Sequence, residues 1–493
     1  MHDRLAPARG ALHPTFVPIV ALIVVAHASL LLLAPVNLEY AFVDAAQFFL
    51  THRPALIQEY FSVQANTVGM PFLAAQLSRL LPGVPLLEVT RLIVLAGVPL
   101  LAAAMPRVCR ALGRGDAHLV MAYVLLNPLV WIYAGRATAD FFPMALGIWA
   151  ISLVLQTPLS LRRALVGGLV LGLAAVLKYH AAFLVLPVAA YHLRGAPRAW
   201  PFRSAAVFVA GVAAPLCAYL LVAHDAFGFW LTPPEFQVKH QFGSTGFASN
   251  LVCYAGYLTL LAMPTLPFLP EVARALARRW RPALLALAAM AAIGFFCIAD
   301  NGEMNLGPAD RWVPPSMRAA LFAALSTGLA LPLWLRRRED GRFPVTLWCA
   351  IVAMLVVFSL TRPAQRYLLF VLPLVIALLP AQLFSRRSML VTTLSLFVLA
   401  NAFVEYSRAC TGTASERMAA KIVELGLATS TDLGAISPHV GPSIDHVPPL
   451  RTDYIVVKDR VPDAIAVSQA GLPILPVTYS LVRFPPARGA PGR

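Results

Sequence analysis

Four charged residues interrupt or border apolar stretches of this chain: Asp44, Asp140, Lys178 and Arg366. A carboxylate that is partly withdrawn from water can act as a general base. Ammonium and guanidinium groups can stabilise negative charge that develops during a reaction. These residue types together predict acid–base chemistry beside an anionic group, provided that the fold brings them into one place.

The two aspartates each allow two interpretations. Asp44 follows the first apolar run and has apolar neighbours, so we expect it at the membrane interface, facing inward as a general base. Alternatively, it is a solvated loop residue that caps the next helix. Asp140 precedes Phe141-Phe142-Pro143, and Pro143 suits the first turn of a helix. Asp140 can cap that helix, aim its carboxylate at a cavity formed with the first outer loop, or do both.

The two cations are also candidates for binding an anion. Lys178 interrupts an apolar stretch, and an ammonium there costs several kcal/mol unless it is paired or reaches water. A phosphate near the outer leaflet would be a natural partner; snorkelling to lipid headgroups is the alternative. Arg366, at the outer end of an apolar run, can donate two hydrogen bonds to a phosphate, with Tyr367 as a further donor. The alternative for this pair is interfacial anchoring.

Several other residues are weaker candidates for contacts to a substrate: His52, Glu59, Arg136 and His180. No spacing of Cys and His residues suggests a zinc site, and we expect no metal and no other cofactor. Of the six cysteines, only Cys410 is expected clearly outside the membrane, so no disulfide framework is implied.

The composition identifies the scaffold that must position these residues. Of 493 residues, 59% are hydrophobic and 13% are charged, with a mean hydropathy of +0.73. A soluble protein would have about a quarter charged residues. Apolar runs of about 20 residues, the length of a membrane span, recur along the chain. The run 164–193 is too long for one span and is interrupted at Lys178-Tyr179-His180, so we interpret it as two short segments. This predicts about 13 transmembrane segments.

The net charge of +16 does not indicate a nucleic-acid surface. The arginines concentrate in alternate loops, which the positive-inside rule assigns to the cytoplasm; clear examples are 107–114, 194–203, 274–281 and 336–342. This assignment places the N-terminus in the cytoplasm and the C-terminus outside.

The chain therefore divides into two predicted domains. Residues 1–404 form an all-α polytopic membrane domain with a long first outer loop, 36–85, whose stretches 41–50 and 70–81 are amphipathic. From residue 405 the composition becomes that of a soluble protein. Residues 416–427 read as a helix, and 453–458 and 474–482 as strands, which predicts a small α/β extracytoplasmic domain over 405–493.

Five features in this order resemble the polytopic membrane glycosyltransferases of the GT-C superfamily, such as protein O-mannosyltransferases and lipid A aminoarabinose transferases. They are Asp44 in the first outer loop, the stretch Ala65–Pro71, Gly135–Asp140 with its second acid, Gly168–Lys178, and Arg366-Tyr367. The resemblance covers residues 16–385. Many relatives carry two adjacent acids where this chain has Asp44 followed by Ala45-Ala46, which argues against a metal ion, since a hard divalent cation prefers several oxygen ligands.

The resemblance implies transfer of a sugar from a polyprenyl-phosphate donor to an envelope lipid, glycan or protein, with inversion at the anomeric carbon. It implies that the reaction takes place at the outer face of a bacterial inner membrane. Of the two catalytic acids, Asp44 would deprotonate or orient the acceptor hydroxyl, and Asp140 would assist the binding of the acceptor or of the sugar hydroxyls. Lys178, Arg366 and Tyr367 would bind the donor phosphate. Membrane lipids are the other expected partners, and no nucleic acid is expected.

Other functions remain open at this point. A transporter or flippase for a lipid-linked substrate would share the apolar body, although such proteins often have repeated halves, and this sequence shows no repeat. An envelope polysaccharide polymerase or ligase would be expected to have a large late outer loop, whereas loops 224–250 and 300–316 are modest. A membrane scaffold that recruits partners would give Lys178 no role.

Overall fold

The structure is a computed structural model of the chain. The description below covers residues 16–33, 39–63, 67–156, 159–193, 202–231, 233–234, 246–262, 280–299, 304, 313–329, 345–360, 364–379, 381, 384, 387–427, 454–457, 460–473 and 476–483. In the loops 224–250 and 300–316, residues 232, 235–245, 300–303 and 305–312 lie outside the described residues.

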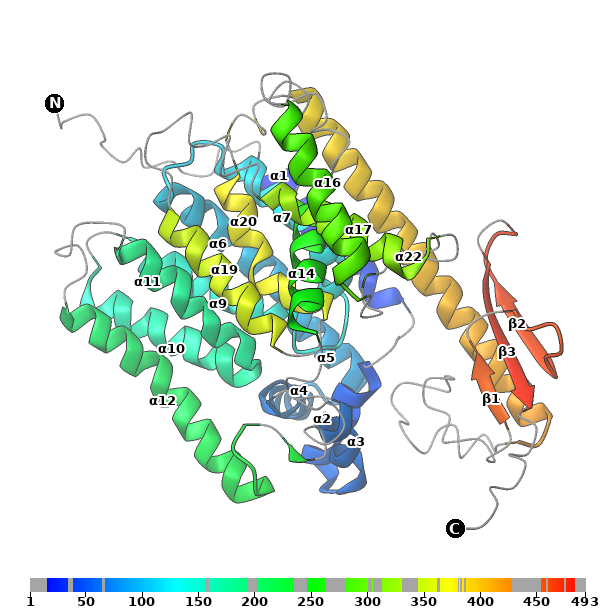
Figure 1. The fold of residues 1–493 in the computed structure, drawn as a ribbon. Coiled ribbons are helices and arrows are strands. Elements are labelled where there is room, and N and C mark those ends of the chain that lie inside the picture. Colours follow the sequence, from blue (N-terminus) through cyan, green and yellow to red (C-terminus); the bar gives the residue numbers. More distant parts are fainter. Residues whose placement is uncertain are drawn as a thin grey trace, which may run out of the picture.

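The described chain is predominantly helical (Figure 1). The first outer segment and the helices before it are α1 (Phe16–Ala28), the 3-10 helix η1 (Ser29–Leu32), α2 (Glu39–Thr51), α3 (Ala55–Val63) and α4 (Gly69–Leu80). The central helices are α5 (Leu86–Leu95), α6 (Gly97–Ala111), α7 (Ala117–Leu126), α8 (Pro128–Ala134), α9 (Phe141–Val154), α10 (Leu161–Leu177), η2 (Tyr179–Leu184), α11 (Val185–Leu193) and α12 (Phe202–Phe227). The later helices are α14 (Phe247–Ala262), α16 (Trp280–Cys297), α17 (Pro315–Ser326), η5 (Thr327–Leu329), α19 (Val345–Ser359), η6 (Gln365–Phe370), α20 (Leu372–Leu378) and α22 (Arg387–Glu424).

Three described helices are long and apolar enough to cross a membrane: Leu86–Ala111, which joins α5 and α6, then α12 and α22. A fourth candidate is the pair α7 and α8, bent by 61° at Asn127. The side chain of Asn127 accepts a hydrogen bond from the Leu129 N–H (3.2 Å), and Pro128 occupies the first turn of α8. Several further apolar helices have only 10–17 residues. The all-α membrane class is confirmed, while the number of about 13 spans stays a prediction.

Close helix packing explains part of the glycine pattern. A Cβ atom on Gly168 of α10 would lie 2.4 Å from the Phe208 carbonyl oxygen of α12. Any side chain there would therefore push the two helices apart, because backbone atoms cannot yield to it. The glycines of the Gly168–Lys178 segment bring α10 and α12 together, and Figure 1 shows these two helices side by side.

The amphipathic stretches of the first outer loop are helices. The predictions for residues 41–50 and 70–81 correspond to α2 and α4, which pack against each other. In Figure 1 α2, α3 and α4 gather at one end of the helical body. Glu39, Phe42 and Asp44 lie on the buried side of α2. The described part of segment 36–85 is thus a layer of short helices set against the main helical body.

The last described part is a small sheet on a long helix. α22 has 38 residues and extends from the helical body to the sheet (Figure 1). The sheet is antiparallel, in the order β1 (Tyr454–Val457), β3 (Val477–Arg483), β2 (Ala466–Ala470). β2 and β3 pack on α22, and Leu481 and Met418 are buried between them. The predicted helix 416–427 is the end of α22, and β1 and β3 lie at the predicted strands; β2 was not predicted.

Candidate functional site

The centre of the candidate site is a buried ion pair between Asp140 and Lys178. The Lys178 Nζ lies 2.9 Å from the Asp140 Oδ1, and the two side chains are 0% and 1% exposed. Lys178 therefore does not snorkel to water. Asp140 precedes α9, but its carboxylate makes no capping hydrogen bond. Asp140 is thus the N-cap residue of α9 by position, but its carboxylate is turned to the ammonium and does not cap the helix.

Arg366 and Tyr367 of η6 join this pair. The Arg366 Nε lies 3.8 Å from the Asp140 Oδ1, and its side chain is 21% exposed. The Lys178 Nζ lies 5.4 Å from the centre of the Tyr367 ring, over its face. His180 stacks on Tyr367, with ring centres 3.9 Å apart. Asp140, Lys178, His180, Arg366 and Tyr367 thus form one group, which we call the cationic cluster.

Each part of the cationic cluster lies at an interruption of a helix. α10 ends at Lys178, whose backbone is extended (φ −157°, ψ 116°) and is followed by η2. Arg366 and Tyr367 lie in η6, just before α20, and Asp140 ends the loop that leads into α9. η2, η6 and α9 contact one another. Where a helix is interrupted, backbone and side-chain groups become available to bind a ligand. Membrane proteins tolerate such interruptions where the chain lines a polar site.

The charge state of Asp140 follows from its neighbours. Burial alone would raise the pKa of its carboxyl group. The positive charges of Lys178 and Arg366, with a hydrogen bond from Thr138, outweigh burial and hold this pKa below its ordinary value. Asp140 is therefore ionised at neutral pH. It is suited to orienting Lys178 and poorly suited to accepting a proton.

The first outer loop packs directly on the end of α10. The Tyr60 hydroxyl donates to the Thr67 carbonyl oxygen (2.7 Å), and the Val68 N–H donates to the Tyr219 hydroxyl of α12 (2.9 Å). Gly69 then abuts Val176, two residues before Lys178. The loop that carries Asp44 is therefore adjacent to the cationic cluster.

A substitution of Gly69 tests the packing of α4 against the end of α10. A Cβ at this position would lie 2.4 Å from the Val176 carbonyl oxygen, so Gly69→Ala should displace α4 from the end of α10. We expect a loss of about 1–3 kcal/mol in stability, the usual cost of overpacking, measured by thermal unfolding in detergent. Gly115→Ala is the matched control, because nothing lies within 4 Å of the Cβ it would add. Equal unfolding temperatures for the two variants would contradict the contact.

The remaining candidates lie at different places. Asp44 is 2% exposed on α2, as expected for an inward-facing carboxylate. His52 is exposed at the end of α2 with a positive φ of 56°, and its ring faces Phe48. Arg136 lies over the Tyr133 ring, 5.0 Å from its centre. Glu59 belongs to α3, but its side chain lies outside the described part of the chain.

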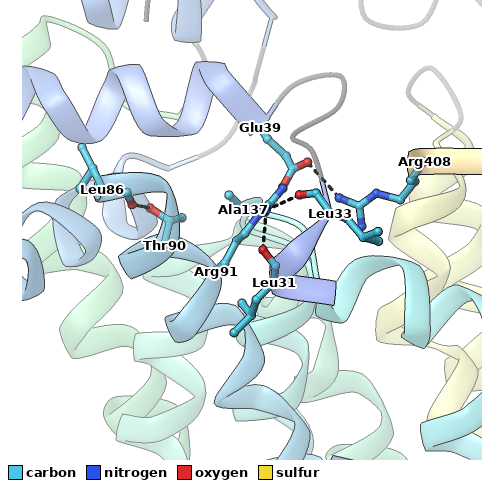
Figure 2. A network of polar contacts seen from close by, with 8 residues as sticks. All are labelled: Leu31, Leu33, Glu39, Leu86, Thr90, Arg91, Ala137 and Arg408. Carbon is cyan, nitrogen blue, oxygen red and sulfur yellow. Dashed lines mark hydrogen bonds and ion pairs between the residues drawn. The ribbon is translucent and has the colours of Figure 1, made fainter. Parts of the chain in front are cut away.

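A second polar network escaped the sequence analysis (Figure 2). Glu39, at the start of α2, is fully buried between Arg91 of α5 and Arg408 of α22, with ion-pair distances of 3.1 and 3.3 Å. Its carboxylate also accepts the Ala137 N–H. Arg91 lies inside an apolar run, and such a charge is itself a signal of a buried partner. The sequence alone does not indicate which acid that partner is.

No metal site is built in the described part of the chain. Its residues contain no group of three or more His, Cys, Asp or Glu side chains that could hold a metal ion. The cationic cluster has one carboxylate, one lysine and one arginine, a composition that favours an anion. That the protein needs no cofactor stays a prediction.

Comparison with known proteins completes the description. No protein-family model matches the sequence, and no curated protein is significantly similar to it. Among solved structures, ArnT from Cupriavidus metallidurans in the apo state is 14% identical, with a TM-score of 0.42 over 83% of this chain and 80% of that one. ArnT from Cupriavidus metallidurans bound to undecaprenyl phosphate is 15% identical, with a TM-score of 0.42 over 95% of this chain and 97% of that one.

Proposed function

We propose that this protein is an integral membrane glycosyltransferase that moves a sugar from a polyprenyl-phosphate donor to an envelope lipid, glycan or protein. The observation that carries the proposal is the cationic cluster: a fully buried lysine and a partly exposed arginine converge on a single carboxylate. The cluster therefore has an excess positive charge within an apolar scaffold. A phosphate on a lipid combines the two properties that such a site selects, because its head is anionic and its tail is apolar.

In this proposal Lys178 and Arg366 bind the donor phosphate. When the bond between the anomeric carbon and the phosphate oxygen breaks, negative charge grows on the departing lipid phosphate. Cations that are already in place stabilise this charge at little cost in reorganisation. This electrostatic stabilisation supplies the larger part of the rate enhancement in such reactions. Asp140 holds the Lys178 ammonium in position, and Tyr367 packs beside it. Because Arg366 is partly exposed, the phosphate headgroup of the donor reaches the cluster from the side on which Arg366 lies.

Asp44 is the proposed base. Attack on the anomeric carbon requires an acceptor hydroxyl that loses its proton, and the proton passes to a carboxylate within reach. Asp140 is committed to Lys178, whereas Asp44 is a second buried carboxylate, on the outer-loop layer that packs next to the cluster. Attack from the face opposite the phosphate inverts the anomeric configuration. The membrane is proposed to be a bacterial inner membrane, with this chemistry on its outer side.

The donor class is tested by direct binding. Purified protein in nanodiscs should bind undecaprenyl phosphate, the ligand held in one of the two similar structures, at least about tenfold more tightly than the uncharged undecaprenol. The reason is a charge-assisted contact worth about 1.5–3 kcal/mol. Equal affinity for the two lipids would exclude a phosphate site.

An activity measurement distinguishes a glycosyltransferase from a transporter or flippase and from a polymerase or ligase. A lipid-linked sugar in the same nanodiscs should be consumed, with release of the lipid phosphate, when an envelope extract supplies the acceptor. A transporter or flippase would move the lipid-linked sugar across a liposome bilayer without consuming it. A polymerase or ligase would join the glycans to one another into a longer product. Either of these results would replace the proposed function.

A further inference from the structure

Glu39 makes an unusually dense set of contacts for an acid in a membrane protein. Its side chain is 0% exposed. The Oε1 atom accepts from the Arg91 Nε (3.2 Å), the Arg91 Nη2 (3.1 Å) and the Ala137 N–H (2.8 Å). The Oε2 atom accepts from the Arg408 Nη2 (3.3 Å). One carboxylate therefore joins α2, α5, α22 and the loop before α9, as Figure 2 shows.

The contact with Ala137 links this network to the cationic cluster. Ala137 lies three residues before Asp140 in the loop between α8 and α9. Within that loop the Thr138 N–H donates to the Arg136 carbonyl oxygen (2.7 Å). The loop is thus held in its middle by Glu39, through Ala137, and at its last residue, Asp140, by Lys178.

Arg91 makes the Glu39 side of this arrangement rigid. Its Nη1 donates to the carbonyl oxygens of Leu33 (2.7 Å) and Leu31 (3.3 Å), at the end of the first apolar segment. The guanidinium therefore spans between that segment and Glu39. Since a planar guanidinium donates in fixed directions, it fixes the position of the carboxylate as well as neutralising it.

We infer that Glu39 is a positioning residue, which acts through the Ala137 N–H to hold the loop that presents Asp140 to Lys178. The inference rests on the proposed function only where it concerns turnover. An amide at position 39 would be a poor replacement. It would carry an N–H donor towards Ala137 or Arg408, which are themselves donors, and it would leave two arginines without their negative partner.

Hydrogen exchange tests the inference without any substrate. In nanodiscs, Glu39→Gln should speed exchange of the Ala137 amide by at least about tenfold, the equivalent of about 1.4 kcal/mol. Glu39→Asp is a second variant that preserves the negative charge and draws the carboxylate back by one carbon–carbon bond, about 1.5 Å. It should also expose this amide while keeping an ion pair with Arg91. Glu88→Gln, a change of the same kind on α5, is the control and should leave exchange unaltered.

Substrate measurements separate positioning from simple loss of structure. Undecaprenyl phosphate should bind Glu39→Asp within about threefold of the wild-type affinity, because Arg366 and Lys178 come from other elements. Turnover of a lipid-linked sugar should fall at least tenfold, with the change in kcat rather than in the KM for the donor. Unchanged exchange at Ala137 in a folded variant would overturn the inference. The inference would also be overturned if Glu39→Asp lost binding and turnover equally and its amides exchanged faster throughout α2 and α9. A wild-type protein that transfers no sugar would instead remove the proposed function and leave the exchange result standing.

Discussion

Lys178→Met should weaken binding of undecaprenyl phosphate to the protein by more than about tenfold. Methionine has a similar length and fits the buried volume, but it cannot pair with an anion. Loss of one charge-assisted contact weakens binding by about 10- to 150-fold, the equivalent of about 1.5–3 kcal/mol. Binding is measured by titrating the lipid into protein in nanodiscs, and turnover of a lipid-linked sugar should fall further because the same cation stabilises the leaving phosphate.

Stability must be separated from binding in this variant. Lys178→Met leaves the buried Asp140 carboxylate without its closest cation, which costs about 3–5 kcal/mol in comparable buried pairs. The double variant Lys178→Met with Asp140→Asn removes both charges and should recover most of that stability, since neither buried ion is then left alone. It should still bind the lipid about 10- to 150-fold more weakly than the wild type. A double variant that binds undecaprenyl phosphate normally would exclude Lys178 from the phosphate site.

Asp44→Asn should have the largest effect on catalysis with the smallest effect on binding. The asparagine side chain has the same shape but cannot accept a proton, and general base catalysis contributes about 10²–10⁴-fold to rate. We therefore expect turnover of a lipid-linked sugar to fall by about that factor. The affinity for undecaprenyl phosphate should stay within about threefold of the wild type, because Lys178 and Arg366 are unchanged.

Asp225→Asn is the matched control for this experiment. Asp225 is an exposed acid near the end of α12, so its neutralisation should change neither binding nor turnover. Normal sugar transfer by Asp44→Asn would remove the assignment of Asp44 as the base. A fall in turnover that is matched by Asp225→Asn would point instead to a general effect of surface charge.

Much of the architecture follows from the sequence alone. Long apolar runs with few charges permit only a membrane protein, because no aqueous surface can be built from them. The amphipathic stretches of the first outer loop are the helices α2 and α4. The interruption at Lys178-Tyr179-His180 is a real end of helix α10, because an ammonium in an apolar run must be directed to a partner. These features depend on residues close together in the chain, where periodicity and composition are informative.

The partners of the buried charges could not be obtained in this way. The unusual position of Lys178 shows that it needs a counter-charge, but that it pairs with Asp140 is a result of how α9, η2 and η6 pack. Nothing in the sequence around Glu39 distinguishes it from other acids of segment 36–85. Its partners, Arg91 and Arg408, come from two helices that are distant in sequence. β2 is short and gave no distinct pattern; it is defined by its pairing with β3.

The sequence by itself therefore determined the class of the protein, the helices of the outer loop and the residues whose charge requires an explanation. Only the tertiary structure decided which charges meet, that the Asp140 carboxylate pairs with Lys178 and makes no capping hydrogen bond to α9, and that the Glu39 carboxylate holds the same loop. The physical reason is that burying a charge costs free energy anywhere in the chain, so a charged residue within an apolar run can be recognised from the sequence around it. Helix packing, which brings together residues far apart in sequence, determines which group offsets that cost.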